Sequence, residues 1–431
     1  MRRSDAATRK PVFLGWGVVA VAALASFTEV SFFNPVLGVF MPALTEDFGW
    51  GRTEVSGAMT TGSLLGALLS PWFGPLIDRY GGRRFVAGGA FVMFLCLVAL
   101  AMLQNVWQFY IFYSIGRGMA SGIVGLAATV TVSKWFVRRR GLAVGLTTLG
   151  TRAGFAIMPI GVQLIIGGWG WREAWLALAA IVLVLGILPA VRFLHPRPEA
   201  LGLLPDGDSA AAPRGGDGKR FASEVSWTRD AAVRTKAFWL VTAAISLQAW
   251  AGGAINMHQI PHLVDQGLSP ESAALIISLL ALFAAAGSLL EGVLDERIGA
   301  RWTLVIGLVG SAGGMVVLMN VHGTDMALAY AAAYGVAFGL MVTSSQVVFA
   351  DYFGREAIGA IRGAAAPIQM GLNAIGPVVA GAAYDLTGNY LAAFIPFTAA
   401  YLLAAASLVA ARKPVVPERL AIETAGAVAA G

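Results

Sequence analysis

The feature that most constrains this chain is the recurrence of apolar stretches long enough to cross a lipid bilayer. A helix needs about 20 predominantly apolar residues to span the hydrocarbon core. Such stretches recur from Phe13 to Ala411. Only 13% of the residues are charged, about half the share in soluble globular proteins. We therefore predict an all-α protein of the membrane and not a soluble enzyme.

The apolar stretches predict twelve transmembrane helices arranged as two pseudo-symmetric six-helix bundles. The expected spans are residues 13–41, 53–77, 84–104, 107–134, 141–167, 173–193, 238–264, 271–294, 302–321, 326–350, 358–386 and 390–411. A polar stretch rich in Pro, Gly, Asp and Ser separates the sixth span from the seventh, as linkers do. We expect an N-terminal tail (1–12), one bundle (13–194), a linker (195–237), a second bundle (238–411) and a C-terminal tail (412–431).

The basic residues predict which way the chain crosses the membrane. With the N-terminus inside, all but four of the 30 Lys and Arg residues fall in the tails, the linker or loops of one side. The exceptions are Arg52 and Arg172, which fall in loops of the other side, and Arg117 and Arg152, which fall within spans. Because cytoplasmic loops carry the excess of Lys and Arg, we expect both termini, and with them the linker, in the cytoplasm. The net charge of +6 then needs no nucleic-acid partner.

Two sequence matches at nearly one spacing indicate a duplicated unit. The pattern Gly-x3-acid-Arg-x-Gly-x-Arg begins at Gly74 and again at Gly292, 218 residues later. An aromatic residue followed by Phe occurs at Trp135 and again at Tyr352, 217 residues later. Odd-numbered helices of one half thus correspond to odd-numbered helices of the other. The two halves therefore have the same topology, and an axis along the membrane normal relates them.

These motifs resemble those of the major facilitator superfamily, and the resemblance covers the chain apart from its linker and tails. Within it, Gly38 to Pro42, Gly170-Trp171-Arg172 and His262 to Ser269 resemble the monocarboxylate porters and oxalate–formate antiporters. Two positions depart from that branch: Ser288 and Gln369 stand where its carriers commonly have Arg and Lys. A doubly charged substrate is therefore not expected, and a monocarboxylate must find another cation. The resemblance also favours a bacterial inner membrane, and we expect a monomer.

Two ionisable residues lie near the predicted bilayer midplane, where a charge costs about 2.5–3.5 kcal/mol on insertion scales. Arg152, among small residues that leave room for a ligand, is the candidate substrate site, since Arg binds a carboxylate with two hydrogen bonds. Glu29 is the candidate proton-coupling carboxyl and could share the cavity of Arg152. The alternatives are a structural Glu29–Arg152 ion pair, an Arg152 turned away from the cavity, or a Glu29 that never titrates.

Two further residues are candidates for proton coupling. Arg117 lies in the fourth span and resembles the Arg that helps coupling or packing in the superfamily. The alternative for Arg117 is an Arg bonded to carbonyls of adjacent helices. His258 lies in the outer half of the seventh span and could sense external pH, because His titrates near neutrality. The alternative for His258 is a hydrogen-bonded structural residue.

Polar residues of later spans could complete the wall of a substrate cavity, although each could equally bond within its own helix or to a neighbour. These candidates are Asn256, Gln346, Gln369 and Asn373. The repeated loop motif is expected to govern conformational gating through charge contacts between helix ends instead of touching substrate. Its residues are Gly74, Asp78, Arg79, Arg83, Glu296 and Arg297.

The sequence carries no nucleotide-binding Walker loop, no hydrolase nucleophile motif and no His or Cys cluster at metal spacing. We therefore expect no catalytic residue, cofactor or metal, and a gradient as the source of energy. The first hypothesis is proton-coupled transport of a small organic anion, in particular a monocarboxylate, by alternating access. The alternatives are a proton-driven exporter of a metabolite or drug, and a sensor that binds without transporting.

Overall fold

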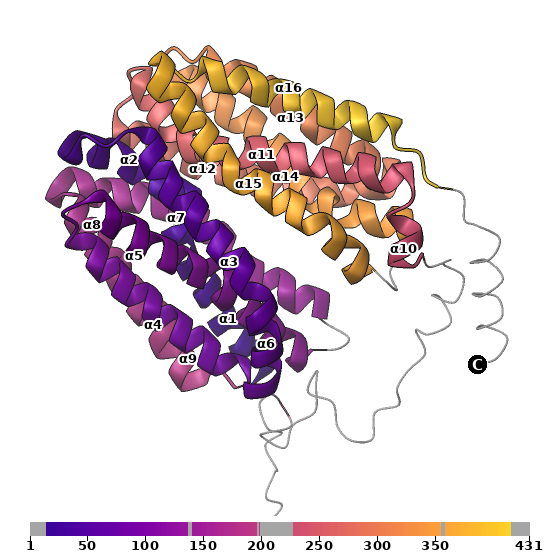
Figure 1. Cartoon of the computed structure of the whole chain (residues 1–431), viewed down its shortest axis with the longest axis horizontal. Coiled ribbons are helices and arrows are strands. Elements are labelled where there is room, and N and C mark those ends of the chain that lie inside the picture. The colour runs from indigo at the N-terminus through magenta and orange to yellow at the C-terminus, as the bar shows by residue number, and fades with distance from the viewer. Residues whose placement is uncertain (1–13, 137–139, 196–197, 199–226, 355–357, 415–431) are drawn as a thin grey trace, which may run out of the picture.

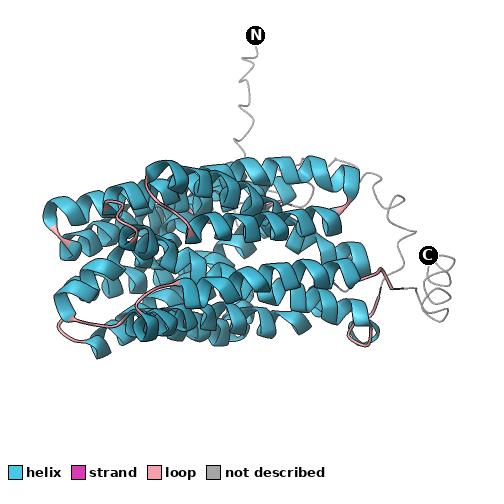
Figure 2. Ribbon diagram, turned by 90° about the horizontal axis from the view of Figure 1, so that it is seen from above, coloured by secondary structure: helices cyan, strands magenta, loops and turns pink. Residues whose placement is uncertain are grey.

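The computed structural model describes residues 14–136, 140–195, 198, 227–354 and 358–414. Figures 1 and 2 show this part of the chain as helices joined by short loops, without a strand among the described residues. The expected tail 1–12 and most of the expected linker and C-terminal tail lie outside the described residues. The all-α fold predicted from the apolar stretches is confirmed.

Each half of the chain contributes six long helical segments, and three segments of the first half are divided into shorter pieces. The first half contains α1 (Gly15–Glu29), η1 (Val30–Phe32), α2 (Asn34–Phe48), α3 (Arg52–Tyr80), α4 (Gly82–Ala101), α5 (Val106–Met119), η2 (Ala120–Val124), α6 (Gly125–Trp135), α7 (Arg140–Trp169), α8 (Trp171–Ile181), η3 (Val182–Ile187) and α9 (Leu188–Phe193). The second half contains α10 (Arg229–Ala232), α11 (Lys236–Asp265), α12 (Pro270–Ile298), α13 (Ala300–Met319), α14 (Thr324–Phe353), α15 (Ile358–Thr387) and α16 (Leu391–Ala410).

Ten of these segments are long and apolar enough to cross a membrane. The other two expected spans, α3 and α15, have 29 and 30 residues and do not belong to these ten. They pack against each other where the two halves meet. At this contact the hydroxyl of Thr60 on α3 donates to the carbonyl of Ala374 on α15 at 2.5 Å, so a polar side chain of α3 bonds across the boundary between the halves.

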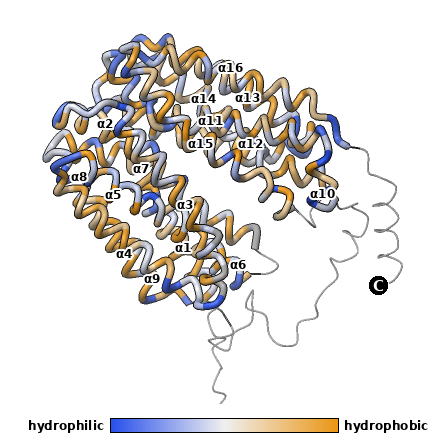
Figure 3. The backbone as a smooth tube through the Cα atoms, in the orientation of Figure 1, coloured by the Kyte–Doolittle hydropathy of each residue, from blue (hydrophilic) through white to orange (hydrophobic). Residues whose placement is uncertain are grey.

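The outer surface of the helices is apolar, as a lipid environment requires. Large exposed side chains include Leu289, Trp72 and Leu68, which are 80%, 76% and 70% exposed. Figure 3 shows hydrophobic colour along helices such as α4 and hydrophilic colour near helix ends. Together with the ten apolar helices, this surface identifies a multi-pass integral membrane protein.

The first span is broken, although the sequence predicted one continuous helix over 13–41. Phe33 adopts an extended conformation between η1 and α2. Pro35, which follows Asn34, has no backbone N–H to continue the helical bonding pattern. The carbonyl oxygen of Phe32 is released by this break and accepts hydrogen bonds from Tyr113 and Arg117 of α5.

The repeated loop motif has the same backbone role in both halves. Gly81 connects α3 to α4 with φ 84° and ψ 141°, and Gly299 connects α12 to α13 with φ 84° and ψ 150°. Positive φ favours glycine, which explains its recurrence in the motif. Arg83 donates to the carbonyl of Val191 at the end of the sixth span. Arg301 donates to the carbonyl of Leu408, 2.9 Å away, at the end of the twelfth.

The second repeated pair is also equivalent in space. The Trp135 indole donates to the carbonyl of His195 at 2.9 Å, just beyond α9. The Tyr352 hydroxyl donates to the carbonyl of Ala411 at 2.6 Å, just beyond α16. In each half, therefore, an aromatic side chain of the fourth span donates a hydrogen bond to the backbone just beyond the sixth span.

The two bundles converge at one end of the molecule and diverge at the other (Figure 1). We name the end that contains Leu14, His195 and Ala411 the terminal side and the opposite end the distal side. Between the bundles, α2 packs on α11, α3 on α15 and α7 on α12. The hydrogen bonds that close the distal side are described below.

Candidate functional site

Arg152 is directed toward the second bundle by the glycines beside it. A Cβ atom on Gly150 would lie 1.9 Å from the carbonyl oxygen of Ala23, and one on Gly154 would lie 2.6 Å from the side chain of Val30. These glycines therefore bring α7 close to the first span. Arg152 is two residues from each, so at about 100° per residue it faces the opposite way. The glycines thus orient Arg152 and do not themselves make room for a ligand, contrary to the sequence interpretation.

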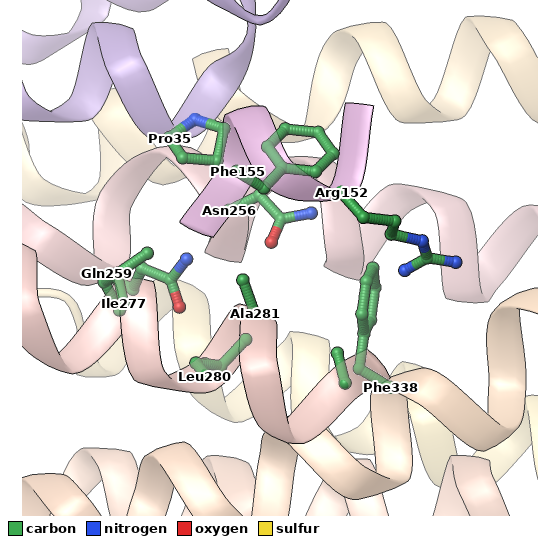
Figure 4. A pocket seen from close by; sticks show the side chains of 10 residues that line it. Pro35, Arg152, Phe155, Asn256, Gln259, Ile277, Leu280, Ala281 and Phe338 are labelled. Carbon is green, nitrogen blue, oxygen red and sulfur yellow. The ribbon is translucent and has the colours of Figure 1, made fainter. Parts of the chain in front are cut away.

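Arg152 lines a cavity between the bundles, which we name the Arg152 cavity (Figure 4). It offers about 130 Å³ to the centres of water molecules. One cationic side chain and two amides face walls that are otherwise apolar. The lining residues are Pro35, Arg152, Phe155, Asn256, Gln259, Ile277, Leu280, Ala281, Ala284 and Phe338.

Within the described part of the chain, the guanidinium of Arg152 has neither a hydrogen bond nor an ion pair. The hypothesis that Glu29 shares its cavity is wrong, because Glu29 is absent from the lining. An internal Glu29–Arg152 ion pair is likewise absent among the described residues. Arg152 therefore lines one end of the cavity, where Figure 4 shows its guanidinium beside Phe338, and it has no counter-ion among the described residues.

Glu29 is buried inside the first bundle and is 6% exposed. A Cβ atom on Gly125 would lie 2.8 Å from its Oε2, so its carboxyl points toward the fourth span. Its Oε1 has no hydrogen-bond partner among the described residues. Arg117 is the charged neighbour whose field reaches it. A buried carboxyl with an unpartnered oxygen is less costly in its neutral form than as a carboxylate.

Arg117 is held by groups of its own bundle. Its Nη1 donates to the carbonyl of Phe32 at 3.1 Å and its Nε to the hydroxyl of Ser63 at 3.2 Å. The guanidinium also stacks over the ring of Phe33, 4.4 Å from the centroid. This is the carbonyl-bonded arrangement that the sequence analysis gave as the alternative to a coupling role. This arrangement leaves Arg117 beside Glu29 and in the lining of a second cavity.

The second cavity lies between α3, α5, α11 and α15, and we name it the Gln369 cavity. It offers about 270 Å³ to water centres. Gln369 and Asn373 line it together with Arg117. Asn373 donates to the carbonyl of Ala249 at 2.9 Å, whereas the Gln369 Nε2 has no partner among the described residues. Of the five expected substrate residues, Arg152 and Asn256 thus line the first cavity, and Gln369 and Asn373 line the second. The side chain of Gln346 lies outside the described structure.

Arg52 joins the two bundles at the distal side. Its guanidinium donates to both carboxylate oxygens of Asp265, at 2.8 and 2.9 Å, and to the hydroxyl of Tyr390 at 2.6 Å. Asp385 accepts from the backbone N–H groups of Arg52 and Thr53 at 3.0 and 2.9 Å. A carboxylate of α15 thus caps the first turn of α3, whose own N-cap residue, Gly51, supplies no side-chain bond. We name these contacts the distal closure.

His258 belongs to the distal closure. Its Nε2 lies 2.9 Å from the carbonyl of Pro377 and 3.1 Å from the hydroxyl of Ser56, and its Nδ1 lies 2.8 Å from the hydroxyl of Tyr390. A carbonyl only accepts, so Nε2 carries a proton. Tyr390 accepts from Arg52, which leaves the tyrosine proton to bond to Nδ1. A neutral His258 therefore satisfies the whole network.

The gating candidates of the repeated motif lie at the terminal side. Arg79 places its guanidinium 5.4 Å from the ring centroid of Tyr80. Glu296 and Arg297 are exposed. The side chain of Asp78 lies outside the described structure, and a Cβ atom on Gly74 would have open space around it. Of the motif, Arg83 and Arg301 bond to helix ends, and Asp295 at one of its variable positions accepts from the hydroxyl of Ser344 on α14 at 3.3 Å.

Sequence reasoning missed three contributors to these sites. Gln259 carried a signal, because its i+3 spacing from Asn256 places both amides on one helix face. Arg52 stood out as a lone cation in a distal loop, which was the available signal for its role. Phe338 gave no signal, because an aromatic residue in an apolar span is indistinguishable from lipid-facing sequence.

Comparison with known proteins gives consistent results. The family model described as Major Facilitator Superfamily matches residues 16–260 and 249–429. Monocarboxylate transporter 11 of Mus musculus is 27% identical over 88% of this chain and 84% of its own length. Monocarboxylate transporter 13 of Bos taurus is 25% identical over 90% of this chain and 88% of its own. These relatives are mammalian and lend no support to the expected bacterial origin.

Solved structures share the fold. A bacterial homologue of the human lysosomal transporter Spinster, inward-facing and occupied, superposes with a TM-score of 0.67 at 15% identity over 93% of this chain and 97% of its own. A mutant form of the nucleoside transporter NupG superposes with a TM-score of 0.70 at 13% identity over 92% of this chain and 100% of its own. The family match, the helical architecture and the relatives agree with the sequence prediction: the chain belongs to the Major Facilitator Superfamily, and it is a transporter that resembles the monocarboxylate branch and not an enzyme.

Proposed function

We propose that this protein transports a monocarboxylate together with a proton, and that Arg152 binds the carboxylate. The observation that carries the proposal is the guanidinium of Arg152, which lines a cavity between the bundles and has no partner among the described residues. A lone charge within the bilayer costs about 2.5–3.5 kcal/mol, so an uncompensated one is expected to serve a ligand. A carboxylate would complete the site, because a guanidinium binds it with two parallel hydrogen bonds.

The charge of the cavity favours one carboxylate over two. Arg152 is the single cation among its lining residues, and no acid is among them. Ser288, where related carriers have Arg, donates to the carbonyl of Gly339 at 3.2 Å. It is therefore packed against α14, and the cavity wall of α12 runs from Ile277 to Ala284. The relatives named as monocarboxylate transporters support the same substrate class.

Glu29 is the proposed proton carrier. It is buried, its Oε1 lacks a partner among the described residues, and it lies in a different part of the bundle from Arg152. Proton and anion would then occupy separate sites in the first bundle. Coupling between them would act through the first span. Glu29 ends α1, the Phe32 carbonyl shortly after it accepts from Arg117, and Pro35 beyond the break lines the cavity.

Alternating access would be a rocking of the two bundles, taken as residues 13–194 and 238–411. In this conformation the distal closure joins the bundles, whereas the terminal sides lie apart (Figure 1). The loop motifs that contain Asp78, Arg79, Glu296 and Arg297 would meet when the terminal side closes. We propose that this side faces the cytoplasm, because the excess of Lys and Arg lies there.

Purified protein in liposomes that contain a pH-sensitive dye tests the proposal. Addition of monocarboxylates, with dicarboxylates and neutral compounds as controls, is expected to acidify the interior faster than in empty liposomes. Glu29→Gln is expected to abolish that acidification and to retain exchange of labelled for unlabelled acid. If no acid moves protons beyond passive diffusion, proton symport is excluded and proton-driven export by antiport becomes the better account.

A further inference from the structure

Apart from Arg152 and two amides, the lining of the Arg152 cavity is apolar. On α12, Ile277, Leu280, Ala281 and Ala284 follow the i, i+3, i+4, i+7 spacing of a single helix face. These side chains form a continuous apolar wall. Figure 4 shows the rings of Phe155 and Phe338 beside the same space, close to Arg152. A ligand that leaves this region empty forfeits its apolar contacts.

The other side of the cavity carries two neutral amides. Asn256 and Gln259 lie three residues apart on α11, and Figure 4 shows Gln259 across the cavity from Arg152, with Asn256 between them. The hydroxyl of Tyr330 donates to the Gln259 Oε1 at 2.6 Å. This bond fixes the amide and leaves its NH2 group as the available donor. Asn256 makes no hydrogen bond among the described residues.

We infer that the substrate is an elongated monocarboxylate with a branched or aromatic body and a neutral hydrogen-bond acceptor at its far end. This inference rests on the proposed function, since it requires the carboxylate at Arg152. The body would lie against the α12 wall, and the acceptor, such as a ketone, amide or ether oxygen, would meet the Gln259 NH2. Tyr330 is then a positioning residue, which selects the donor face of that amide.

The same lining rejects other acids. A second carboxylate at the far end would meet amides and no cation, so it would lose its hydration without a counter-ion. An amino acid would place its ammonium group in a cavity without an acid among its lining residues. Acetate would reach Arg152 alone and would leave the apolar wall unused.

Calorimetric titration of the purified protein with four acids tests the inference: acetate, phenylacetate, 4-acetylphenylacetate and 4-carboxyphenylacetate. Phenylacetate is expected to bind about tenfold or more tightly than acetate through the apolar wall. The acetyl group is expected to add about fivefold through the Gln259 donor. The second carboxylate is expected to weaken binding below that of phenylacetate.

Two variants separate the contributions of the cavity. Gln259→Leu is expected to remove the advantage of the acetyl group while phenylacetate binds as before. Tyr330→Phe is expected to reduce that advantage in part, because the amide is freed to rotate. Ala281→Phe fills the apolar wall and is expected to weaken phenylacetate while acetate is unaffected, which keeps the test valid if Gln259→Leu fails to fold.

Equal binding of acetate and phenylacetate, or an acetyl advantage that survives Gln259→Leu, would overturn the inference. If acetate still lost its binding on Arg152→Gln in that case, the proposed function would stand without this refinement. Failure of all four acids to bind would overturn the proposed function and the inference together.

Discussion

The Arg52–Asp265 pair gives the most quantitative prediction, because it links two bundles that must separate during transport. The side chains of Arg52 and Asp265 are 12% and 27% exposed, and two hydrogen bonds join them. Loss of one partner costs about 3–5 kcal/mol in fully buried pairs and about 0.2–1 kcal/mol in exposed ones. For this partly exposed pair, Asp265→Asn is expected to cost about 1–2 kcal/mol, a factor of about 5–30 in the ratio of distal-closed to distal-open molecules.

Spin-label distances across the distal side measure this ratio. The labels would occupy Gln104→Cys and Thr324→Cys, two exposed positions on different bundles, in a protein whose one native cysteine, Cys96, is replaced by alanine. Asp265→Asn is expected to add a population at longer distance. Asp47→Asn is the matched control, because Asp47 pairs with Arg172 at 3.3 Å within one bundle. The same distribution in Asp265→Asn and in the parent would refute a role of the pair in distal closure.

Three further predictions use glycine packing and the His258 network. Gly381→Ala, whose Cβ would lie 2.8 Å from the carbonyl oxygen of Arg52, is expected to increase the distal-open population in the same spin-label assay. Gly371→Ala, with open space around its Cβ, is the control, and equal effects would contradict the packing argument. Gly150→Ala is expected to destabilise the protein by about 1–3 kcal/mol through overpacking against α1, measured as a lower melting temperature in detergent; an unchanged melting temperature would be inconsistent with the contact. Acidification from about pH 7.5 to about pH 5.5 is expected to favour distal opening, because protonation of His258 at Nδ1 removes the acceptor of the Tyr390 hydroxyl. His258→Asn should abolish this response, and a response that persists would place the pH sensor elsewhere.

Much of the fold was predictable because it depends on local sequence. Apolar stretches predicted every long helix, and the repeated motif indicated equivalent positions that the structure places at equivalent helix ends, as Arg83 and Arg301 illustrate. The break in the first span was less evident, although Pro35 was its signal. A proline restricts the helix locally, but whether the helix bends or breaks depends on the groups that accept or donate nearby, here Tyr113 and Arg117.

The site was harder to predict because rotation about a helix axis is a property of packing. Glu29 and Arg152 have similar expected depths, and depth alone suggested one shared cavity. The structure separates them: Glu29 faces Gly125, whereas the glycines beside Arg152 turn it toward the second bundle. The distal closure joins residues more than 200 positions apart in sequence, such as Arg52 and Asp265. Such partners become apparent only when the bundles are placed side by side.

Binding of an acid by Arg152 is the central claim, and calorimetric titration of phenylacetate tests it most directly. Arg152→Gln is expected to weaken binding about 10- to 150-fold, the loss of charged hydrogen bonds worth about 1.5–3 kcal/mol. Arg172→Gln, which removes an arginine at the distal surface, is the matched control and should bind as the parent does. Equal affinities of the parent and both variants would contradict the account, because the carboxylate would then bind at a site that does not include Arg152.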